Sequence, residues 1–144
     1  MPKFCIQEHH AKKAGLHWDL RVEVPGEPEA LTCCIGKRHW DQTTEPKPQR
    51  DSDKSVLASW AIPKAKLPAK GERLFAIKTE DHPFEYLTFE GEIEEGYGAG
   101  TIKLVQTGDC QVIQGKSGWK LELGELGTFK LIPFKKGYLV LRLS

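Results

Sequence analysis

Hydrophobic and polar residues alternate along much of this chain, which is the pattern of half-buried β-strands. The alternation is clearest in Lys-Leu-Glu-Leu at 120–123 and in Phe-Lys-Leu at 129–131. Turn residues separate the segments that we expect to be strands, which are 4–7, 17–24, 74–80, 86–93, 101–107, 110–114, 118–124, 127–134 and 137–144. The pattern predicts an all-β, mainly antiparallel fold, in the form of a small closed β-barrel.

Helical patterns are short wherever they occur. The best candidate is His-His-Ala-Lys-Lys-Ala-Gly-Leu at 9–16, in which Gly15 would end the helix. No segment predicts a helix longer than about two turns. We therefore expect only short helices at the periphery of the barrel.

The length of 144 residues fits one domain that buries its own core, so we predict a single domain over 1–144. Residues 36–55 are polar and charged and contain prolines, which predicts a long surface loop. Its basic residues are a candidate contact for nucleic acid, but a solvated insertion is the favoured interpretation. These residues are Lys37, Arg38, Lys47 and Arg50.

The formal net charge of +1 conceals an uneven distribution. Residues 1–78 carry 14 Lys or Arg against 10 Asp or Glu, whereas residues 79–144 carry 7 against 10. A basic first half is compatible with a nucleic-acid partner. No apolar stretch is long enough for a membrane span and the start has no signal-peptide core, so we expect a cytoplasmic protein without a membrane partner.

The four cysteines contain no C-x-x-C pair, which disfavours a zinc ribbon or a secreted disulfide framework. We expect reduced and mostly buried thiols at Cys5, Cys33, Cys34 and Cys110. A metal site made by Cys33, Cys34 and His39 is the alternative.

Chemically unusual residues lie in the predicted strand 17–24. Alternation places His17, Asp19 and Arg21 on one face and the apolar residues between them on the other. An ordinary solvated strand face is the simpler interpretation. Gln7, His9 and His10 lie a few residues upstream, however, and two imidazoles with one carboxylate suit Mn²⁺, Fe²⁺ or Zn²⁺.

A second polar cluster begins at Glu80 and contains His82, followed by Tyr86. His82 precedes Pro83, so by itself it is most simply a histidine in a turn. Together with a metal ion, however, Arg21 and His82 describe a site for an anion, because a guanidinium grips phosphate oxygens and a cation neutralises their charge. Phosphoryl chemistry is the natural use of such a set.

Five sequence blocks in order resemble the 3'-phosphoesterase domain of bacterial DNA ligase D and its free-standing homologues. The first block combines Q-x-H with L-H-x-D-x-R, over residues 7–21. The others are S-W-A-I-P-K at 59–64, E-D-H-P-x-x-Y at 80–86, F-E-G-x-I at 89–93 and G-Y-G-A-G at 96–100. The blocks together span most of the chain.

The resemblance implies a β-barrel enzyme that uses Mn²⁺ to trim 3' ends of DNA or of an RNA–DNA primer-template in DNA repair. Such enzymes remove a terminal ribonucleotide by phosphodiesterase action and then a 3'-phosphate by phosphomonoesterase action, which leaves a 3'-hydroxyl. The attacking oxygen would come from water or from the neighbouring ribose 2'-hydroxyl. We expect any DNA ligase or repair polymerase partner to act in trans.

The resemblance also implies a role for each matching residue. The metal ligands would be His9, His17 and Asp19, with His10 as an alternative because the segment before His17 is slightly longer than usual. The catalytic residues would be Arg21, His82 and Tyr86, of which Arg21 and His82 hold the phosphate. From its chemistry we also expect that His82, when protonated, donates to the leaving oxygen. The supporting residues would be Gln7 and Glu80. Trp60 would pack in the core, and Lys64 would reach the nucleic-acid backbone.

Two other classes of function remain open. His17-x-Asp19 with the distant His82 also resembles the facial triad of a non-haem Fe(II)/2-oxoglutarate oxygenase. In such enzymes a basic residue usually follows the last histidine closely, whereas here the next is Lys103. The third class is a non-catalytic DNA-binding module with a structural metal.

Overall fold

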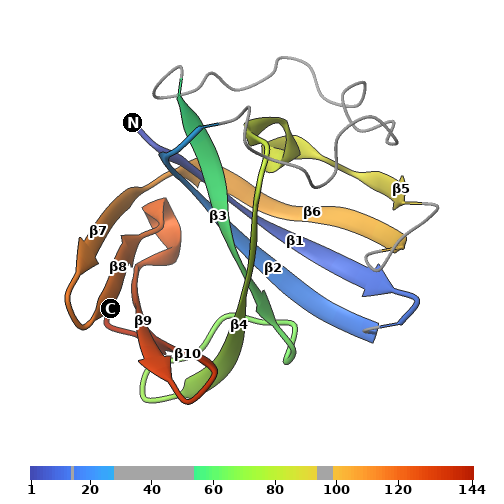
Figure 1. Cartoon of the computed structure of the whole chain (residues 1–144). Coiled ribbons are helices and arrows are strands. Elements are labelled where there is room, and N and C mark those ends of the chain that lie inside the picture. Colours follow the sequence, from blue (N-terminus) through green and yellow to red (C-terminus); the bar gives the residue numbers. More distant parts are fainter. Residues whose placement is uncertain (14, 28–53, 94–98) are drawn as a thin grey trace.

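A computed structural model describes residues 1–13, 15–27, 54–93 and 99–144 (Figure 1). Ten strands account for most of these residues, and the helical turns are the 3₁₀ turns η3 (Phe84–Thr88) and η4 (Gly124–Leu126). The strands are β1 (Lys3–Ala11), β2 (Gly15–Pro25), β3 (Ser55–Ile62), β4 (Arg73–His82), β5 (Gly91–Ile93), β6 (Gly100–Asp109), β7 (Gln111–Gly115), β8 (Gly118–Glu122), β9 (Thr128–Phe134) and β10 (Gly137–Arg142).

The strands form one sheet in the order β5-β6-β1-β2-β3-β4-β10-β9-β8-β7, and each neighbouring pair is antiparallel. The all-β, antiparallel prediction is therefore confirmed. The prediction that the barrel closes is not confirmed, because β5 and β7 are the two edges and do not pair with each other. Sequence alternation reports which face a residue occupies, but it carries no information on whether the outermost strands meet.

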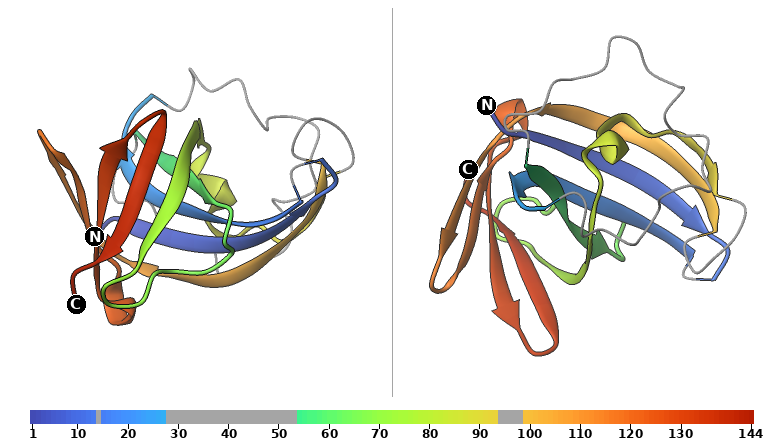
Figure 2. Two further views of the ribbon diagram at one scale, coloured as in Figure 1. Left: turned by 90° about the horizontal axis from the view of Figure 1, so that it is seen from below. Right: turned by 45° about the horizontal axis from the view of Figure 1, so that its top comes forward.

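The sheet curls until β8, β9 and β10 pack against β1, β2 and β3 (Figure 2). The enclosed core contains large side chains such as Trp60, Leu20 and Phe129, all 0 % exposed. A smaller core lies on the other face of β1 and β3, where η3 contributes Phe84 and Leu87. Strands β1 and β3 are thus covered on both faces, and polar residues on their η3 side, such as Gln7 and Ser59, are buried.

Two local predictions are wrong. Residues 9–16 do not form a helix, because β1 and β2 continue as a hairpin on either side of a turn, and β1 also pairs with β6. Cross-strand hydrogen bonds on both sides of β1 override the weak helical preference of this short segment. Residues 86–93 are not one strand, because η3 ends at Thr88 and only Gly91–Ile93 pairs as β5.

Cys5 and Cys110 are buried and free, as predicted for reduced thiols. Cys33, Cys34, His39 and the basic residues 37, 38, 47 and 50 lie outside the described residues, as do residues 96–98 of the G-Y-G-A-G block. Residues 36–53 of the predicted loop 36–55 also lie outside the described residues. Ser55, its last residue, belongs to β3. The single-domain prediction for 1–144 stays a prediction.

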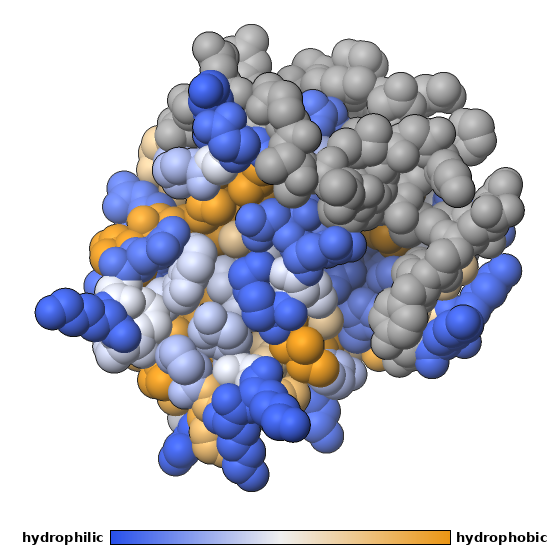
Figure 3. Space-filling model, in the orientation of Figure 1, coloured by the Kyte–Doolittle hydropathy of each residue, from blue (hydrophilic) through white to orange (hydrophobic). Residues whose placement is uncertain are grey.

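The surface in view is mainly hydrophilic, with small separate hydrophobic areas (Figure 3). Exposed apolar side chains include Phe75, Ile77 and Phe134, near the turn that joins β9 to β10. Within the described residues, no helix has the length and apolar character that a membrane crossing requires.

Candidate active site

The β1–β2 hairpin brings the first candidate residues together by register. His9 lies directly opposite His17, and Gln7 lies directly opposite Asp19. Side chains opposite each other on antiparallel strands share one face of the sheet. The apolar residues of β2, including Leu20 and Val22, point to the other face and into the main core. The predicted separation of β2 into a chemical face and a packing face is confirmed.

His9, His17 and Asp19 place their potential ligand atoms within 4.8 Å of one another. His9 Nδ1 lies 3.4 Å from Asp19 Oδ2, and His17 Nε2 lies 3.3 Å from Asp19 Oδ1. Two donors bound about 2.1 Å from one tetrahedral ion are about 3.4 Å apart. The three residues therefore fit a divalent cation in both donor type and spacing.

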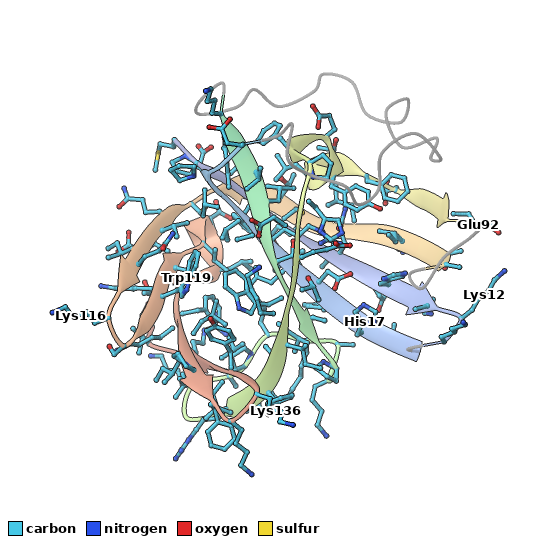
Figure 4. The ribbon with its side chains drawn as sticks, viewed as in Figure 1. Lys12, His17, Glu92, Lys116, Trp119 and Lys136 are labelled. Carbon is cyan, nitrogen blue, oxygen red and sulfur yellow. The ribbon has the colours of Figure 1, made fainter. Side chains whose placement is uncertain are left out.

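The backbone orients the His17 ring. Its Nδ1 lies 3.3 Å from the carbonyl oxygen of Gly15, and a carbonyl only accepts, so the Nδ1 proton points to Gly15. Nε2 is then the nitrogen that faces Asp19. A second partner that fixes the tautomer is typical of metal-binding histidines. Figure 4 labels His17 on β2 and Lys12 in the turn of the same hairpin.

Asp19 is a buried carboxylate, with a side chain that is 6 % exposed. Burial is the largest influence on its pKa and opposes ionisation, but the Arg21 guanidinium and hydrogen bonds from His17 and His9 together lower that pKa well below its usual value. The hydrogen bond to Asp19 in turn raises the pKa of His17, against the effect of burial. Asp19 is therefore a permanent anion at neutral pH, as a cation ligand must be.

Arg21 is held from three directions. Its Nε donates to Gln7 Oε1 at 2.7 Å, its Nη1 donates to Ser59 Oγ at 2.9 Å, and its Nη2 lies 3.4 Å from Asp19 Oδ2. Its guanidinium carbon also lies 5.1 Å from the centre of the Tyr86 ring. Within the described residues these contacts use three of the five guanidinium N–H groups, so two can still donate to an anion.

His82 is the last residue of β4 and lies where that strand meets η3. Its Nδ1 donates to the carbonyl oxygen of Glu80 at 2.8 Å and lies 3.5 Å from Ser59 Oγ. Its ring stacks on Tyr86, with centroids 4.8 Å apart, and Tyr86 stacks on Phe89. The ring is thus oriented by a backbone acceptor and by an aromatic stack.

Gln7 joins the two halves of the site. Its Oε1 accepts from Arg21, while its Nε2 donates to the carbonyl oxygens of Tyr86 at 2.7 Å and Phe89 at 3.1 Å. Gln7 is 0 % exposed, so these bonds form away from water. The amide fixes η3, which carries the His82 stack, against the strand pair that carries the metal ligands.

The remaining predicted residues do not place their side chains in the His17–Asp19 cluster. His10 lies on the other face of β1 from His9 and is exposed, so it does not join the His17–Asp19 cluster. Glu80 is exposed and meets the site through its backbone carbonyl. Trp60 is buried in the main core, as predicted, and Lys64 is exposed.

The oxygenase alternative required His82 to join His17 and Asp19 around one ion. Among the described residues, the group close enough to hold a metal comprises His9, His17 and Asp19, and His82 is not part of it. The geometry therefore disfavours a triad that includes His82.

Sequence reasoning missed the role of Ser59, which touches both Arg21 and His82. It also missed Phe89, the third ring of the aromatic stack. The sequence signals were positional, because Ser59 begins the S-W-A-I-P-K block and Phe89 begins the F-E-G-x-I block.

Comparison with known proteins gives consistent matches. A family model described as the DNA Ligase D 3'-phosphoesterase domain matches residues 35–132. This range contains His82 and Tyr86 but begins after β2, so the assignment of His9, His17 and Asp19 as a cluster depends on the geometry.

Curated relatives match over a longer part of the chain. The multifunctional non-homologous end joining protein LigD of Mycolicibacterium smegmatis is 37 % identical over 110 residues, which are 76 % of this chain and 10 % of the relative. The corresponding DNA repair protein of Mycobacterium tuberculosis is 37 % identical over 106 residues, or 73 % of this chain and 10 % of the relative. LigD of Pseudomonas aeruginosa is 36 % identical over a match that covers 46 % of this chain and 11 % of the relative. The chain spans about a tenth of the length of these relatives.

Proposed function

Because the chain belongs to the DNA Ligase D 3'-phosphoesterase domain family, we propose that it is a phosphoesterase that processes DNA 3' ends in end joining. Its substrates would be primer-template ends that carry a terminal ribonucleotide or a 3'-phosphate, and its product would be a 3'-hydroxyl. The observation that carries this proposal is the position of Arg21, which contacts Asp19 on one side and, through Ser59, approaches His82 on the other.

His9, His17 and Asp19 would hold the metal, which we propose is Mn²⁺. A bound divalent cation would neutralise negative charge on the phosphate oxygens. Imidazole and carboxylate ligands suit Mn²⁺, and the set contains no thiolate of the kind that structural zinc prefers.

Arg21 would bind the scissile phosphate with the two N–H groups that its protein partners leave available. The Arg21 side chain is 3 % exposed, and a charge-assisted hydrogen bond is stronger where bulk water is excluded. Gln7 and Ser59 would prevent the guanidinium from turning away, so the phosphate would meet a preorganised donor.

His82 would act on the same phosphate as Arg21, since both side chains contact Ser59 and the Tyr86 ring. Since Nδ1 donates to the Glu80 carbonyl, Nε2 is the nitrogen that gains or loses a proton. The protonated ring would stabilise the phosphate and give the Nε2 proton to the leaving oxygen. Tyr86 would support this step by stacking on the imidazole.

A labelled primer annealed to a template tests the proposal directly. One primer ends in a single ribonucleotide and another ends in a 3'-phosphate, each incubated with Mn²⁺ or with a chelator. We expect both to be converted to 3'-hydroxyl ends only when Mn²⁺ is present. Salt-dependent DNA binding without any product would support the non-catalytic module instead.

A modified diester substrate distinguishes the two sources of the attacking oxygen. This primer ends in two ribonucleotides, and the penultimate ribose, whose 2'-hydroxyl is next to the scissile phosphate, is replaced by 2'-fluoro-ribose, while the matched primer keeps that hydroxyl. Loss of the diester step with an intact monoester step would identify that hydroxyl as the nucleophile. Unchanged cleavage would identify water.

A further inference from the structure

Ser59 occupies the centre of the site without being one of its expected ligands. It lies on β3, opposite Arg21 of β2 on one side and Thr79 of β4 on the other. Opposed residues share a face of the sheet, so its hydroxyl lies on the same face as the guanidinium. Ser59 is 0 % exposed, and the groups around it therefore depend on one another for hydrogen bonds.

The hydroxyl contacts both groups that would hold the phosphate. Ser59 Oγ accepts from Arg21 Nη1 at 2.9 Å, lies 3.5 Å from His82 Nδ1 and donates to the carbonyl oxygen of Leu57 at 3.1 Å. It is a direct link between the guanidinium and the imidazole, which stand 61 residues apart in the sequence.

The directions of these bonds follow from the chemistry of the partners. The Leu57 carbonyl can only accept, so it takes the single hydroxyl proton of Ser59. A guanidinium can only donate, so Arg21 directs an N–H group at the lone pairs of Ser59. His82 Nδ1 carries its proton toward Glu80, which leaves Ser59 as a weaker second acceptor for that same N–H group.

We propose that Ser59 is a positioning residue that fixes the directions of Arg21 and His82 toward the scissile phosphate. This inference rests on the proposed phosphoesterase function, but the effect of Ser59 on Arg21 can be measured in the protein without metal or substrate. Without the hydroxyl, Arg21 Nη1 loses a buried acceptor and the guanidinium gains freedom to rotate. A small misplacement of a group that acts on the transition state lowers kcat more than it raises KM.

Two substitutions separate the hydrogen bond from packing. Ser59→Ala removes the hydroxyl, and Ser59→Cys keeps a side chain of similar size with a much weaker acceptor. Ser55→Ala is the matched control, because Ser55 is also a buried serine on β3. Its hydroxyl donates to Glu23 Oε2 at 2.7 Å, whereas that of Ser59 accepts from Arg21. Thermal unfolding of all three variants reports whether the fold is kept.

The first measurement is NMR of Arg21 without metal or substrate, through the rate of rotation about its Cζ–Nη bonds. We expect faster rotation in Ser59→Ala and Ser59→Cys, and the wild-type rate in Ser55→Ala. Unchanged rotation in both Ser59 variants would overturn the proposal. If Ser59→Ala does not fold, Ser59→Cys answers the same question.

The second measurement is turnover of a primer with a 3'-phosphate in the presence of Mn²⁺. We expect kcat to fall about 10- to 100-fold in both Ser59 variants, with little change in KM. Normal turnover in Ser59→Cys beside reduced turnover in Ser59→Ala would assign the effect to packing and overturn the proposal. If the wild-type protein makes no product, the proposed function fails, and the NMR result still decides whether Ser59 restrains Arg21.

Discussion

His9 and His17 face each other across the β1–β2 hairpin, with ring centroids 4.7 Å apart and planes tilted by 58°. The chain reverses completely between them, and Asp19 lies within 3.4 Å of both rings. The neighbouring histidine, His10, points to the other face of the hairpin. This arrangement gives a direct test of the metal ligands.

We expect His17→Ala to weaken Mn²⁺ binding at least about tenfold, because one of the three proposed protein ligands is lost. His10→Ala should bind Mn²⁺ like the wild type, because His10 is exposed and lies away from the cluster. Isothermal titration calorimetry measures both affinities. Equal affinity in His17→Ala, or weakened binding in His10→Ala, would contradict the assignment.

His82→Ala should abolish turnover, because the proposed proton donor is lost. The fold should be kept, because the ring lies at the end of β4 and is only partly buried. Loss of a general acid typically costs about 10²- to 10⁴-fold in rate. The measurement is product formation on a 3'-phosphate primer, with circular dichroism to check the fold and His10→Ala as the control. Wild-type turnover in His82→Ala would exclude the proposed role.

Gly100 should be essential for stability because it lies against the backbone of β1. A Cβ atom at this position would lie 2.0 Å from the carbonyl oxygen of His10, and its φ of 145° is itself unfavourable for other residues. Gly100→Ala should lower the free energy of unfolding by more than the roughly 1–3 kcal/mol of backbone strain alone.

Gly15→Ala is the matched control for Gly100→Ala, because Gly15 also has a positive φ, 78°, but a Cβ there would meet nothing within 4 Å. It should lower the free energy of unfolding by about 1–2 kcal/mol, the cost of placing a residue with a Cβ in the left-handed region. Denaturant unfolding measures both changes. Equal losses in the two variants would show that the contact with His10 can relax.

Cys5 should react very slowly with thiol reagents in the folded protein. Burial raises the pKa of its thiol from 9.0 to about 12, against the influence of Arg21. The thiolate is the reactive form, so at pH 8 this three-unit shift alone lowers the reaction rate about a thousandfold. The rate should then rise as the pH approaches 12, for as long as the protein stays folded.

A variant that retains only Cys5, with Cys33, Cys34 and Cys110 changed to serine, isolates this reaction. Labelling by a chromogenic disulfide at pH 8 measures the rate. The same variant unfolded in guanidinium should react at the rate of an ordinary cysteine. Similar rates in the folded and unfolded states would show that the Cys5 thiol is accessible and unperturbed.

Local alternation predicted much of the fold and part of the site. It assigned β2 correctly to a polar face and an apolar face, because successive side chains of any strand point in opposite directions. It failed at 9–16, where pairing with two neighbours selects a strand. It also failed at 86–93, where η3 forms over buried Phe84, Tyr86 and Leu87.

The sequence by itself determined the types of donor that are present and which residues of one strand share a face. These properties follow from residue identity and from the two-residue period of a strand. Only the tertiary structure decided that His9 rather than His10 stands opposite His17, that Arg21 is buried and that Ser59 joins it to His82. Those relationships depend on the register between strands and on the packing of η3, which bring together side chains that are distant in the chain.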